Sequence, residues 1–476
     1  MAGTWTVDDH LADVLRSVRP LEPIELHLLD AQGCVLVEDV LASVSLPPFD
    51  NSSMDGYAVR ADDVAKASED EPVVLEVVGD VAAGSGTVPD VGPGRAARVM
   101  TGAPLPPGAD AVVPVEWTDG GTGGGPVDTM AAHSADPSGA GGEVRVHRPV
   151  EARQYVRDKG GDLRAGAVAL EAGTILGPAQ IGLLAAVGRA TVRVRPRPRV
   201  VVLSTGSELV RPGLPLGPGR IHDSNSYVLT AAARAAGAIA YRVDAVADDA
   251  TTLRTVIEDQ LVRADAIVTS GGVSVGAYDV VKEALTDLAG TALGGGLPEE
   301  SDDRDRGRDG DGDGHEDGPD REKGRRKPPP PTRSVEFRRL AMQPGKPQGF
   351  GLVGPDAVPL FALPGNPVSS YVSFELFVRP ALRALMGLDP ADRRTVRARV
   401  EPDDSAPLTS PEGKRQFLRG RYEPPADGEE IGTVRPVGGP GSHLLGSLAR
   451  ADALIVVPER TTEIARGDEL EAVLLD

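Results

Sequence analysis

The 476-residue chain is long enough for about three domains at roughly 150 residues each, and 40% of its residues are hydrophobic. The net charge of −21 argues against a nucleic-acid-binding or anionic-membrane surface, so an anionic ligand would need a locally basic pocket. A single cysteine, Cys34, excludes an internal disulfide and predicts a cytoplasmic protein, and we recognise neither a signal peptide nor an apolar run of about 18 residues.

The first predicted element is an amphipathic helix. Apolar residues recur on one helical face of Val7–Val18, and Thr6 can cap its start. Two short strands, Ile24–Leu29 and Val35–Val40, follow around the turn Asp30–Gly33. Nothing before residue 45 indicates chemistry.

Ser45–Val59, SLPPFDNSSMDGYAV, is the first loop that could be functional. Two prolines break regular structure, and the carboxylates of Asp50 and Asp55 follow in a segment with little helix or strand propensity. Loops that carry such groups often belong to binding sites. The pattern alone nevertheless favours a simple Asp-Gly turn at Asp55.

Two further loops precede residue 170. Arg98–Glu116 is rich in proline and glycine and leads into a strand over Ala111–Val115. Its Thr101 offers a hydroxyl, for which a turn cap is the simpler interpretation. Arg157–Gly166 ends in a turn before the short strand Ala167–Leu170.

Strands and helices alternate after residue 198, beyond a linker at Arg195–Pro198. The predicted elements are, in order, a strand at Val200–Leu203, a helix at Tyr227–Ala236, a strand at Ile239–Val246, a helix at Thr252–Val262 and a strand at Ala266–Thr269. This order predicts a doubly wound parallel sheet, in which ligands lie beyond the carboxyl ends of the strands. Ser204–Glu208, Asp248 and Gly271–Asp279 fall at that edge.

A glycine-rich turn follows the last of these strands. Ser270–Gly276 reads SGGVSVG, and Asp279 opens a helical pattern. Glycines allow close approach of a ligand to the backbone, and free N–H groups at a helix start favour anions. The stretch fits neither the Walker A nor the G-x-G-x-x-G pattern, and a phosphate site and a tight packing turn are equally compatible with it.

Three carboxylates are predicted at this edge: Glu208, Asp248 and Asp279. Oxygen ligands beside a phosphate suit Mg²⁺. A helix N-cap is an alternative role for Asp248, and a solvated loop position is an alternative for Glu208.

Residues 294–333 interrupt the pattern with a charged segment rich in Gly and Pro, which predicts disorder. Its aspartates mimic the start of an EF-hand loop, but no flanking helices are predicted and position twelve is Asp320. We therefore reject a calcium site there.

The sheet is expected to resume at Val335–Leu340. Arg338, Arg339 and Lys346 then supply the positive charge that an anionic ligand would need. Phe361–Pro367 reads as a strand entering a rigid loop, and Pro367–Leu385 as a helix.

Short strands and turns after residue 390 predict a small β-barrel. Its expected strands are Thr395–Val400, Gln416–Tyr422, Gly432–Val437, Ala453–Val457 and Leu470–Leu474. Arg415, Arg419 and the loop at Gly441–His443 could reach a ligand, although a lone His443 is more often structural.

Several of these stretches resemble motifs of the MoeA/gephyrin family, the molybdopterin molybdenumtransferases. Ala264–Leu285 carries the family's SGGVSxGxxD signature, and Ser45–Val59 is similar to FDNSAMDGYA, with Ser53 in place of Ala. The remaining similarities are IMTGAPLPxGADAVV at Arg98–Glu116, GxDxxxG at Asp162, STGDEL at Ser204–Leu209, DxN at Asp223–Asn225, RDD at Asp248-Asp249, KPGKP at residues 343–347 and GLPGNPVS around Pro364–Pro367. Ser207 stands where the family usually has Asp, and Gln343 where it commonly has Lys.

The resemblance implies a multidomain α/β and β protein. The expected parts are an N-terminal linker and dimerisation domain (1–57 and 150–196), a small mixed β domain (58–149), a central doubly wound α/β molybdopterin-binding domain (197–390) and a C-terminal β-barrel (391–476). It also implies a homodimer whose site joins the central domain of one chain to the N-terminal part of the other.

The implied reaction inserts molybdate into adenylylated molybdopterin and releases AMP, with Mg²⁺ as cofactor and no nucleic-acid or membrane partner. The resemblance assigns catalytic roles to Asp279, Glu208, Asp55, Thr101 and Asp162, and metal binding to Asp279, Glu208 and Asp248. It assigns substrate binding to Ser204, Thr205, Gly206, Asp223, Asn225, Gly271, Gly272, Ser274, Gly276, Arg339, Lys346, Pro364 and Pro367.

Two alternatives remain open at this point. A related enzyme could adenylylate molybdopterin with only the central fold in common, but the matches at Asp55, Thr101 and Pro364–Pro367 disfavour it. A non-catalytic scaffold of the gephyrin type is disfavoured by the retained carboxylates.

Overall fold

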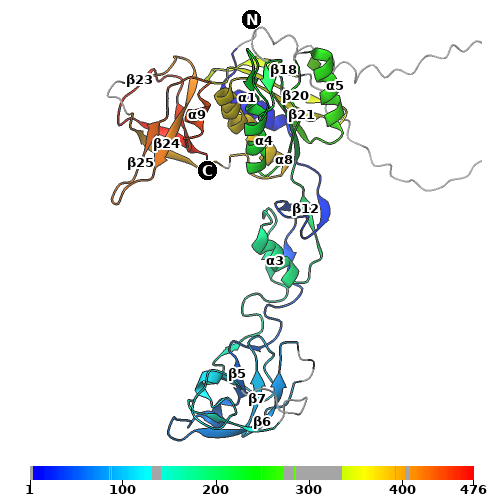
Figure 1. Ribbon diagram of the computed structural model, residues 1–476, viewed down its shortest axis with the longest axis vertical. Helices are drawn as coiled ribbons and strands as arrows, with labels where there is room; N and C mark the ends of the chain where they lie inside the picture. Colours follow the sequence, from blue (N-terminus) through cyan, green and yellow to red (C-terminus); the bar gives the residue numbers. More distant parts are fainter. Residues whose placement is uncertain are drawn as a thin grey trace, which may run out of the picture. The chain divides into compact units, whose positions relative to one another are not determined.

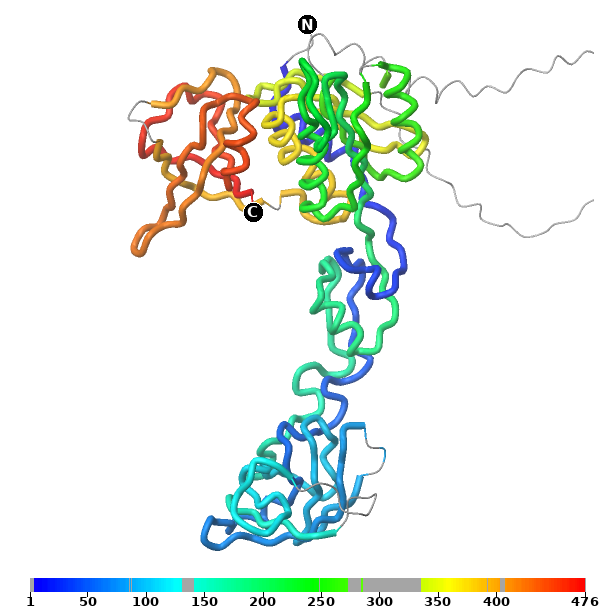
Figure 2. Tube along the Cα trace, viewed as in Figure 1, coloured from blue at the N-terminus to red at the C-terminus, as the bar shows by residue number. Residues whose placement is uncertain are grey.

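The computed structural model describes residues 4–84, 86, 88–130, 141–247, 249–272, 284–285, 335–391, 393–402 and 407–475. The chain forms two compact units, one of residues 1–22 with 195–476 and the other of residues 23–194 (Figures 1 and 2). Asp248, Ser274, Gly276, Asp279 and the insertion 294–333 lie outside the described residues.

A six-stranded sheet forms the centre of the first unit. Its order is β16 (Ile239–Arg242), β13 (Arg199–Ser204), β17 (Ala266–Ser270), β21 (Val358–Leu363), β20 (Pro347–Val353) and β18 (Glu336–Arg339). The first four strands are parallel, β20 is antiparallel to β21, and β18 is antiparallel to β20, so that β20 alone runs in the opposite direction. Strands β17 and β21 are buried along their whole length, which explains their continuous apolar sequences.

Helices cover both faces of this sheet, which confirms the doubly wound α/β fold (Figure 1). One face packs against α1 (Val7–Ser17), α4 (Asn225–Ala235), and the continuous helix formed by α7 (Pro367–Ser373), the π turn η3 (Phe374–Val378) and α8 (Arg379–Leu385). The opposite face packs against α5 (Ala250–Leu261). Asp249 caps α5 by accepting a hydrogen bond from Thr252 N at 2.7 Å.

Helix α1 belongs to this unit, whereas the sequence-based division placed residues 1–57 together. Val14 and Val18 are buried in the core beside α4 and α8. Asp13 forms a buried ion pair with Arg338 of β18, at 2.7 Å. These contacts join segments more than 200 residues apart, so no local pattern predicts them.

The end of the chain forms a closed five-stranded barrel, as predicted. Its strands are β24 (Arg415–Glu423), β25 (Gly432–Pro436), β22 (Thr395–Val400), β28 (Glu469–Leu474) and β26 (Ala453–Val457), and β24 pairs with β26 to close it. Short pieces complete the region: β23 (Leu408–Thr409), β27 (Glu463–Ile464) and α9 (Leu445–Leu448). Strand β19 (Met342–Gln343), which leads into the central sheet, also pairs with β24 and so attaches the barrel to the α/β domain.

The second unit contains a five-stranded sheet and several two- or three-stranded ones. The large sheet has the order β8 (Ala111–Pro114), β5 (Gly56–Val59), β7 (Arg95–Val99), β6 (Val73–Val81) and β9 (Glu143–Val146). The other elements are β1 (Ile24–His27), β2 (Val35–Leu36), β3 (Val40–Leu41), β4 (Asn51–Ser52), α2 (Ala61–Val64), η1 (Val115–Trp117), β10 (Val156–Arg157), β11 (Val168–Leu170), α3 (Pro178–Ala186) and β12 (Thr191–Arg195). Across the described residues, no helix is long and apolar enough to span a membrane.

Candidate active site

The carboxyl edge of the central sheet gathers the predicted residues of the first unit. The chain passes from β13 to β16 on one side and then to β17 on the other, so β13 and β17 flank a topological switch point. Ligands of open α/β sheets bind at such points. Ser204 and Ser270 end these two strands side by side, and Ser270 in turn pairs with Leu363.

The loops beyond these strands pack backbone against backbone. Gly271 has φ +103° and Gly272 φ +67°, conformations that favour glycine. A Cβ atom on Gly271 would lie 2.4 Å from the carbonyl oxygen of Thr205. The Thr205 Oγ1 atom beside it is buried and has no hydrogen-bond partner among the residues that the structure describes. The absence of a side chain at Gly271 therefore allows the two loops to pack closely beside this hydroxyl.

Asn225, at the start of α4, forms hydrogen bonds with the loops that follow β17 and β21. Its Nδ2 donates to Ser270 Oγ at 2.8 Å and to the carbonyl oxygen of Gly365 at 2.6 Å. Ser270 Oγ also accepts a hydrogen bond from the Ser370 hydroxyl at 3.2 Å. The network fixes the position of the Pro364–Pro367 loop relative to the glycine turn.

Asp223 lies in the loop before α4 and serves as a buried acceptor. It accepts hydrogen bonds from Ser204 Oγ at 2.9 Å and from Ser226 N at 3.1 Å, and its second oxygen accepts from Ser226 Oγ. The Asp223 residue is only 2% exposed. Its carboxylate therefore orients the end of β13 from within the protein.

Glu208 is exposed and folds back over the loop that follows β13. Its carboxylate oxygens lie 2.7 and 2.8 Å from the position that a Cβ atom of Gly206 would occupy. Ile221 N donates a hydrogen bond to the Glu208 carbonyl oxygen at 3.0 Å, where β14 (Leu209–Val210) pairs with β15 (Ile221–His222). Of the three predicted metal ligands, only Glu208 lies in the described part of the chain. That part contains no group of three or more His, Cys, Asp or Glu side chains that could hold a metal.

The basic residues predicted after the insertion divide into two groups. Arg338 is buried and paired with Asp13 and Glu336, each at 2.7 Å, so its charge stabilises the fold. Arg339 and Lys346 are exposed. Because β20 is antiparallel to both β21 and β18, Lys346 and Arg339 lie at the same sheet edge as Pro364. Strand spacing places β18 about 14 Å from β17.

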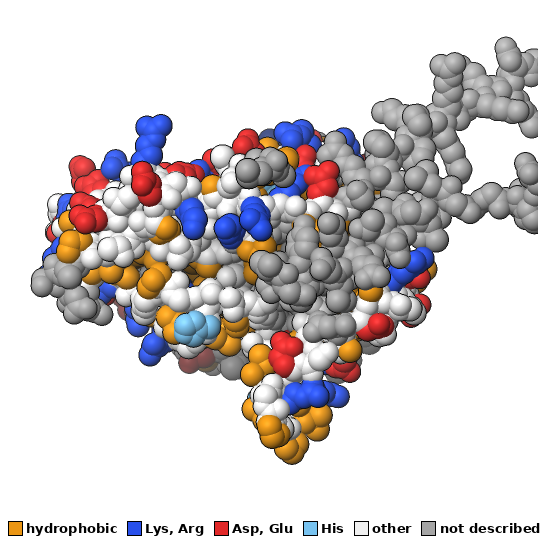
Figure 3. Space-filling model, turned by 90° about the horizontal axis from the view of Figure 1, so that it is seen from above, with side chains coloured by type: hydrophobic (Ala, Val, Ile, Leu, Met, Phe, Trp, Pro, Cys, Tyr) orange, Lys and Arg blue, Asp and Glu red, His pale blue; other side chains and the backbone are white. Residues whose placement is uncertain are grey.

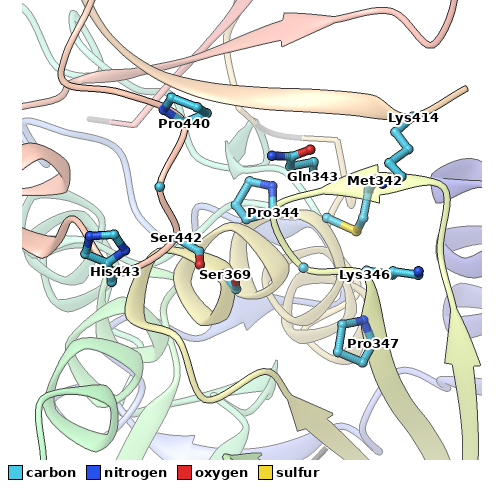
Figure 4. A pocket seen from close by; sticks show the side chains of 12 residues that line it. Met342, Gln343, Pro344, Lys346, Pro347, Ser369, Lys414, Pro440, Ser442 and His443 are labelled. Carbon is cyan, nitrogen blue, oxygen red and sulfur yellow. The ribbon is translucent and has the colours of Figure 1, made fainter. Parts of the chain in front are cut away.

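Lys346 borders a cavity of about 480 Å³ between the α/β domain and the barrel (Figure 4). The described residues that line it are Met342, Gln343, Pro344, Gly345, Lys346, Pro347, Ser369, Lys414, Pro440, Gly441, Ser442 and His443. Sequence analysis missed Ser369 and Lys414. The only signal for Lys414 was its place beside Arg415, because nothing in the sequence indicates that β24 pairs with β19.

In the second unit, the structure brings Asp55 and Thr101 together. Asp55 Oδ1 accepts hydrogen bonds from Thr101 N at 2.6 Å and from Thr101 Oγ1 at 2.9 Å. Both residues are exposed, so the carboxylate faces solvent. Asp162 is also exposed, and its N–H donates to the carbonyl oxygen of Leu46 at 3.0 Å. No contact of Asp162 with Asp55 occurs among the described residues.

Three family models match successive parts of the chain. The MoeA N-terminal region (domain I and II) matches residues 5–188, a probable molybdopterin-binding domain matches 201–299 and 327–384, and the MoeA C-terminal region (domain IV) matches 404–475. The second of these contains β13, β17 and β21, whose carboxyl ends form the edge described above.

Curated relatives and solved structures agree with these matches. Molybdopterin molybdenumtransferase 2 of Mycobacterium tuberculosis is 43% identical over 98% of each chain, and molybdopterin molybdenumtransferase 1 of the same species is 36% identical over 99% of each. The crystal structure of a molybdopterin biosynthesis MoeA protein from Pyrococcus horikoshii is 29% identical, covers 100% of both chains and superposes with a TM-score of 0.67. The chain therefore belongs to the MoeA family of molybdopterin molybdenumtransferases.

Proposed function

We propose that this protein inserts molybdate into adenylylated molybdopterin and releases AMP, a step of molybdenum cofactor biosynthesis. The observation that carries the proposal is the match of a molybdopterin-binding domain to the strands that end at the switch point. Relatives that match nearly the whole chain are named molybdopterin molybdenumtransferases, which supports the same reaction.

The site chemistry suits a substrate with phosphate groups. Gly271 and Gly272 give the turn after β17 a backbone that a phosphate could approach, and the buried side chains of Ser204 and Ser270, held by Asp223 and Asn225, keep the ends of β13 and β17 in fixed positions. A preorganised backbone stabilises charge that develops during the reaction better than a mobile one, because it needs no reorganisation. An oxygen of water or molybdate adds to phosphorus as the phosphoanhydride bond breaks and AMP leaves, and molybdenum passes to the pterin while the oxygen that it gives up leaves as water.

Mg²⁺ and a homodimer are parts of the proposal that rest on the family resemblance. A hard dication would neutralise phosphate charge, and Glu208 is the described carboxylate best placed to hold it. Two identical sites in a symmetric dimer would each use Asp55 and Thr101 of one chain with the sheet edge of the other.

An assay of product formation tests the function. We would incubate the purified protein with adenylylated molybdopterin, Mg²⁺ and molybdate, and measure AMP and molybdenum cofactor. We expect AMP release that requires molybdate and that falls at least about a hundredfold in Asp279→Ala, because a single group that stabilises developing charge commonly contributes that much. A parallel reaction with molybdopterin and ATP tests the adenylyltransferase alternative. Failure of the folded wild-type protein to release AMP would refute the proposal.

A further inference from the structure

The turn at residues 151–156 of the second unit contains two residues with a left-handed backbone. Arg153 has φ +68° and Tyr155 φ +59°, and Ala357 is the only other described residue of this kind that is not glycine. Residues with a Cβ atom avoid this conformation because the Cβ atom crowds a carbonyl oxygen, so surrounding contacts must hold them in it. Backbone strain that is held in this way clusters at functional sites.

The turn lies between the two segments that carry the predicted carboxylates of this unit. Ser53 N and Ser53 Oγ donate to the Tyr155 carbonyl oxygen at 2.9 and 3.0 Å, two residues before Asp55. The end of the turn continues into β10, which pairs with β4 and leads toward Asp162. The conformation of the turn therefore sets the position of the Asp55 segment relative to the Asp162 segment.

Packing holds one of the two strained residues. The Tyr155 ring meets the Trp117 ring edge-on, with centroids 5.6 Å apart, and packs against the buried core around the five-stranded sheet. The Arg153 side chain is 45% exposed, so burial contributes less to holding it. Its conformation depends on polar contacts.

Two ion pairs and a backbone hydrogen bond hold Arg153. Its guanidinium contacts Asp50 Oδ2 at 2.9 Å and Asp158 Oδ1, and its N–H donates to Asp110 O at 2.8 Å. The other carboxylate oxygen of Asp50 accepts a hydrogen bond from Lys159 N at 2.7 Å. The Lys159 N–H, and then the Arg153 guanidinium, hold the pKa of Asp50 below its usual range, so this carboxylate is ionised at neutral pH.

These ion pairs differ from the ordinary charge pairs of the surface. Figure 3 shows Lys and Arg side chains interspersed with Asp and Glu over one face of the molecule. An exposed pair contributes little to stability, because water and salt screen it. Two such pairs are nevertheless comparable in energy with the strain of one left-handed residue, and those of Arg153 lie directly above the strained backbone.

We propose that Arg153 is a positioning residue, which holds the segments of Asp55 and Asp162 in a fixed relative position for the reaction. The inference rests on the proposed function, because it takes both carboxylates as parts of the active site. The guanidinium binds Asp50, which precedes Asp55, and Asp158, which precedes Asp162. Its two ion pairs offset the strain of the turn, so without them the turn relaxes and the two segments move apart.

Hydrogen exchange in the full-length protein tests the positioning without requiring turnover. Arg153→Ala removes both ion pairs but keeps a Cβ atom at the strained position, whereas Arg153→Gly removes the strain as well, because glycine adopts positive φ freely. We expect the N–H groups of Ser53 and Lys159 to exchange at least about tenfold faster in Arg153→Ala, where two ion pairs no longer offset the strain. In Arg153→Gly their exchange should stay within about threefold of the wild-type rate.

The kinetics of AMP release provide a second measurement, which a purely structural role would not change in the same way. Arg153→Ala should lower kcat at least about tenfold and leave KM for adenylylated molybdopterin within about twofold, since displaced reacting groups slow the chemical step. Arg153→Gly should recover kcat to within about threefold of wild type, because it restores the turn. Arg95→Ala is the matched control: it removes an exposed arginine, paired with Glu76 at 3.2 Å, from β7 of the same unit, and should behave as wild type.

The proposal is overturned if Arg153→Ala matches wild type in exchange or in kcat, if Arg153→Gly is impaired as strongly as Arg153→Ala, or if Arg95→Ala lowers kcat equally. Equal impairment of the alanine and glycine variants would mean that the charge matters and the turn does not. In contrast, absence of AMP release by the wild type would refute the proposed function, and the exchange rates would still show whether Arg153 holds the turn.

Discussion

At the level of single residues, the polar side chains of the sheet edge mostly bond to one another. The Asp223 carboxylate is saturated by Ser204 and Ser226, and the Asn225 amide bridges two loops. Buried polar groups of this kind fix the geometry of a site because each has a high cost when it loses its partner. Such residues hold the strand ends and loops of the sheet edge in fixed positions.

Asp223→Ala should therefore destabilise the first unit. The change leaves Ser204 Oγ and the N–H and hydroxyl of Ser226 without their acceptor, and we expect a loss of about 3 kcal/mol in the free energy of unfolding. Asp223→Asn keeps one acceptor oxygen and should lose less. Urea unfolding measures the difference, with the exposed Asp259→Ala as control. Equal stability of Asp223→Ala and wild type would show that the acceptor is dispensable.

Sequence motifs identified residues at this scale but not their partners. Arg338 and Arg339 are adjacent basic residues, and only the structure separates a buried ion pair with Asp13 from an exposed guanidinium. The reason is strand alternation, which sends neighbours to opposite faces. Lys414 escaped notice because its place in the cavity wall depends on the pairing of β24 with β19, some 70 residues earlier in the chain.

At the level of elements, continuous apolar runs and glycine turns were predictable. Val200–Leu203 and Ala266–Thr269 became β13 and β17 within one residue at either end, because fully buried parallel strands need such sequences. The strand expected at Ile239–Val246 is shorter, since β16 ends at Arg242 and only Val246 returns to bridge Thr205. Edge strands with one neighbour tolerate early departure of the chain from the sheet.

Helix α1 illustrates what local sequence cannot predict. Its capping by Thr6 follows from sequence and is present, with Asp9 N donating to Thr6 Oγ1 at 3.0 Å. The surface on which the helix packs does not follow from local sequence, because the contact between His10 and Arg338 spans 328 positions along the chain. His10 also packs edge-on against Phe377 with ring centroids 4.7 Å apart.

This docking should make stability depend on pH. Burial, and then the charge of Arg338, lower the pKa of His10 from 6.5 to about 4, while nearby Asp13 opposes the shift. As pH falls, the unfolded chain binds a proton at His10 before the folded chain does. Stability from the neutral imidazole is therefore complete above pH 6.5 and is lost between pH 6.5 and 4, by up to about 3 kcal/mol.

His10→Gln should flatten this part of the stability profile relative to wild type. Thermal unfolding at several pH values between 7 and 4 measures the slope, and the exposed His27→Gln serves as control. Many other groups of the protein also bind protons in acid, so the informative quantity is the difference between the two histidine variants. Identical slopes for His10→Gln and His27→Gln would contradict the assignment.

At the level of the whole molecule, the predicted residues fall into two units. Ser204, Gly271 and Lys346 belong to the unit of residues 1–22 and 195–476, whereas Asp55, Thr101 and Asp162 belong to residues 23–194. Within each unit the described contacts explain the local geometry. The number of chains that form one complete site is a separate question, for which we propose a homodimer and which subunit mixing can test.

Mixing two inactive variants provides that test. Asp55→Ala removes the acceptor of Thr101 N–H and Oγ1 in the second unit, and Asp279→Ala removes a carboxylate that the sequence assigns to the glycine loop of the first. If each site combines the first unit of one chain with the second unit of its partner, a mixed dimer has one site with both changes and one site with neither. Random exchange makes half of the dimers mixed, so we expect about a quarter of wild-type AMP release. Absence of recovery after exchange has been demonstrated by mass spectrometry would mean that one chain builds the whole site. Wild-type protein diluted with either variant alone is the control, and its activity should fall only in proportion to the intact sites that remain.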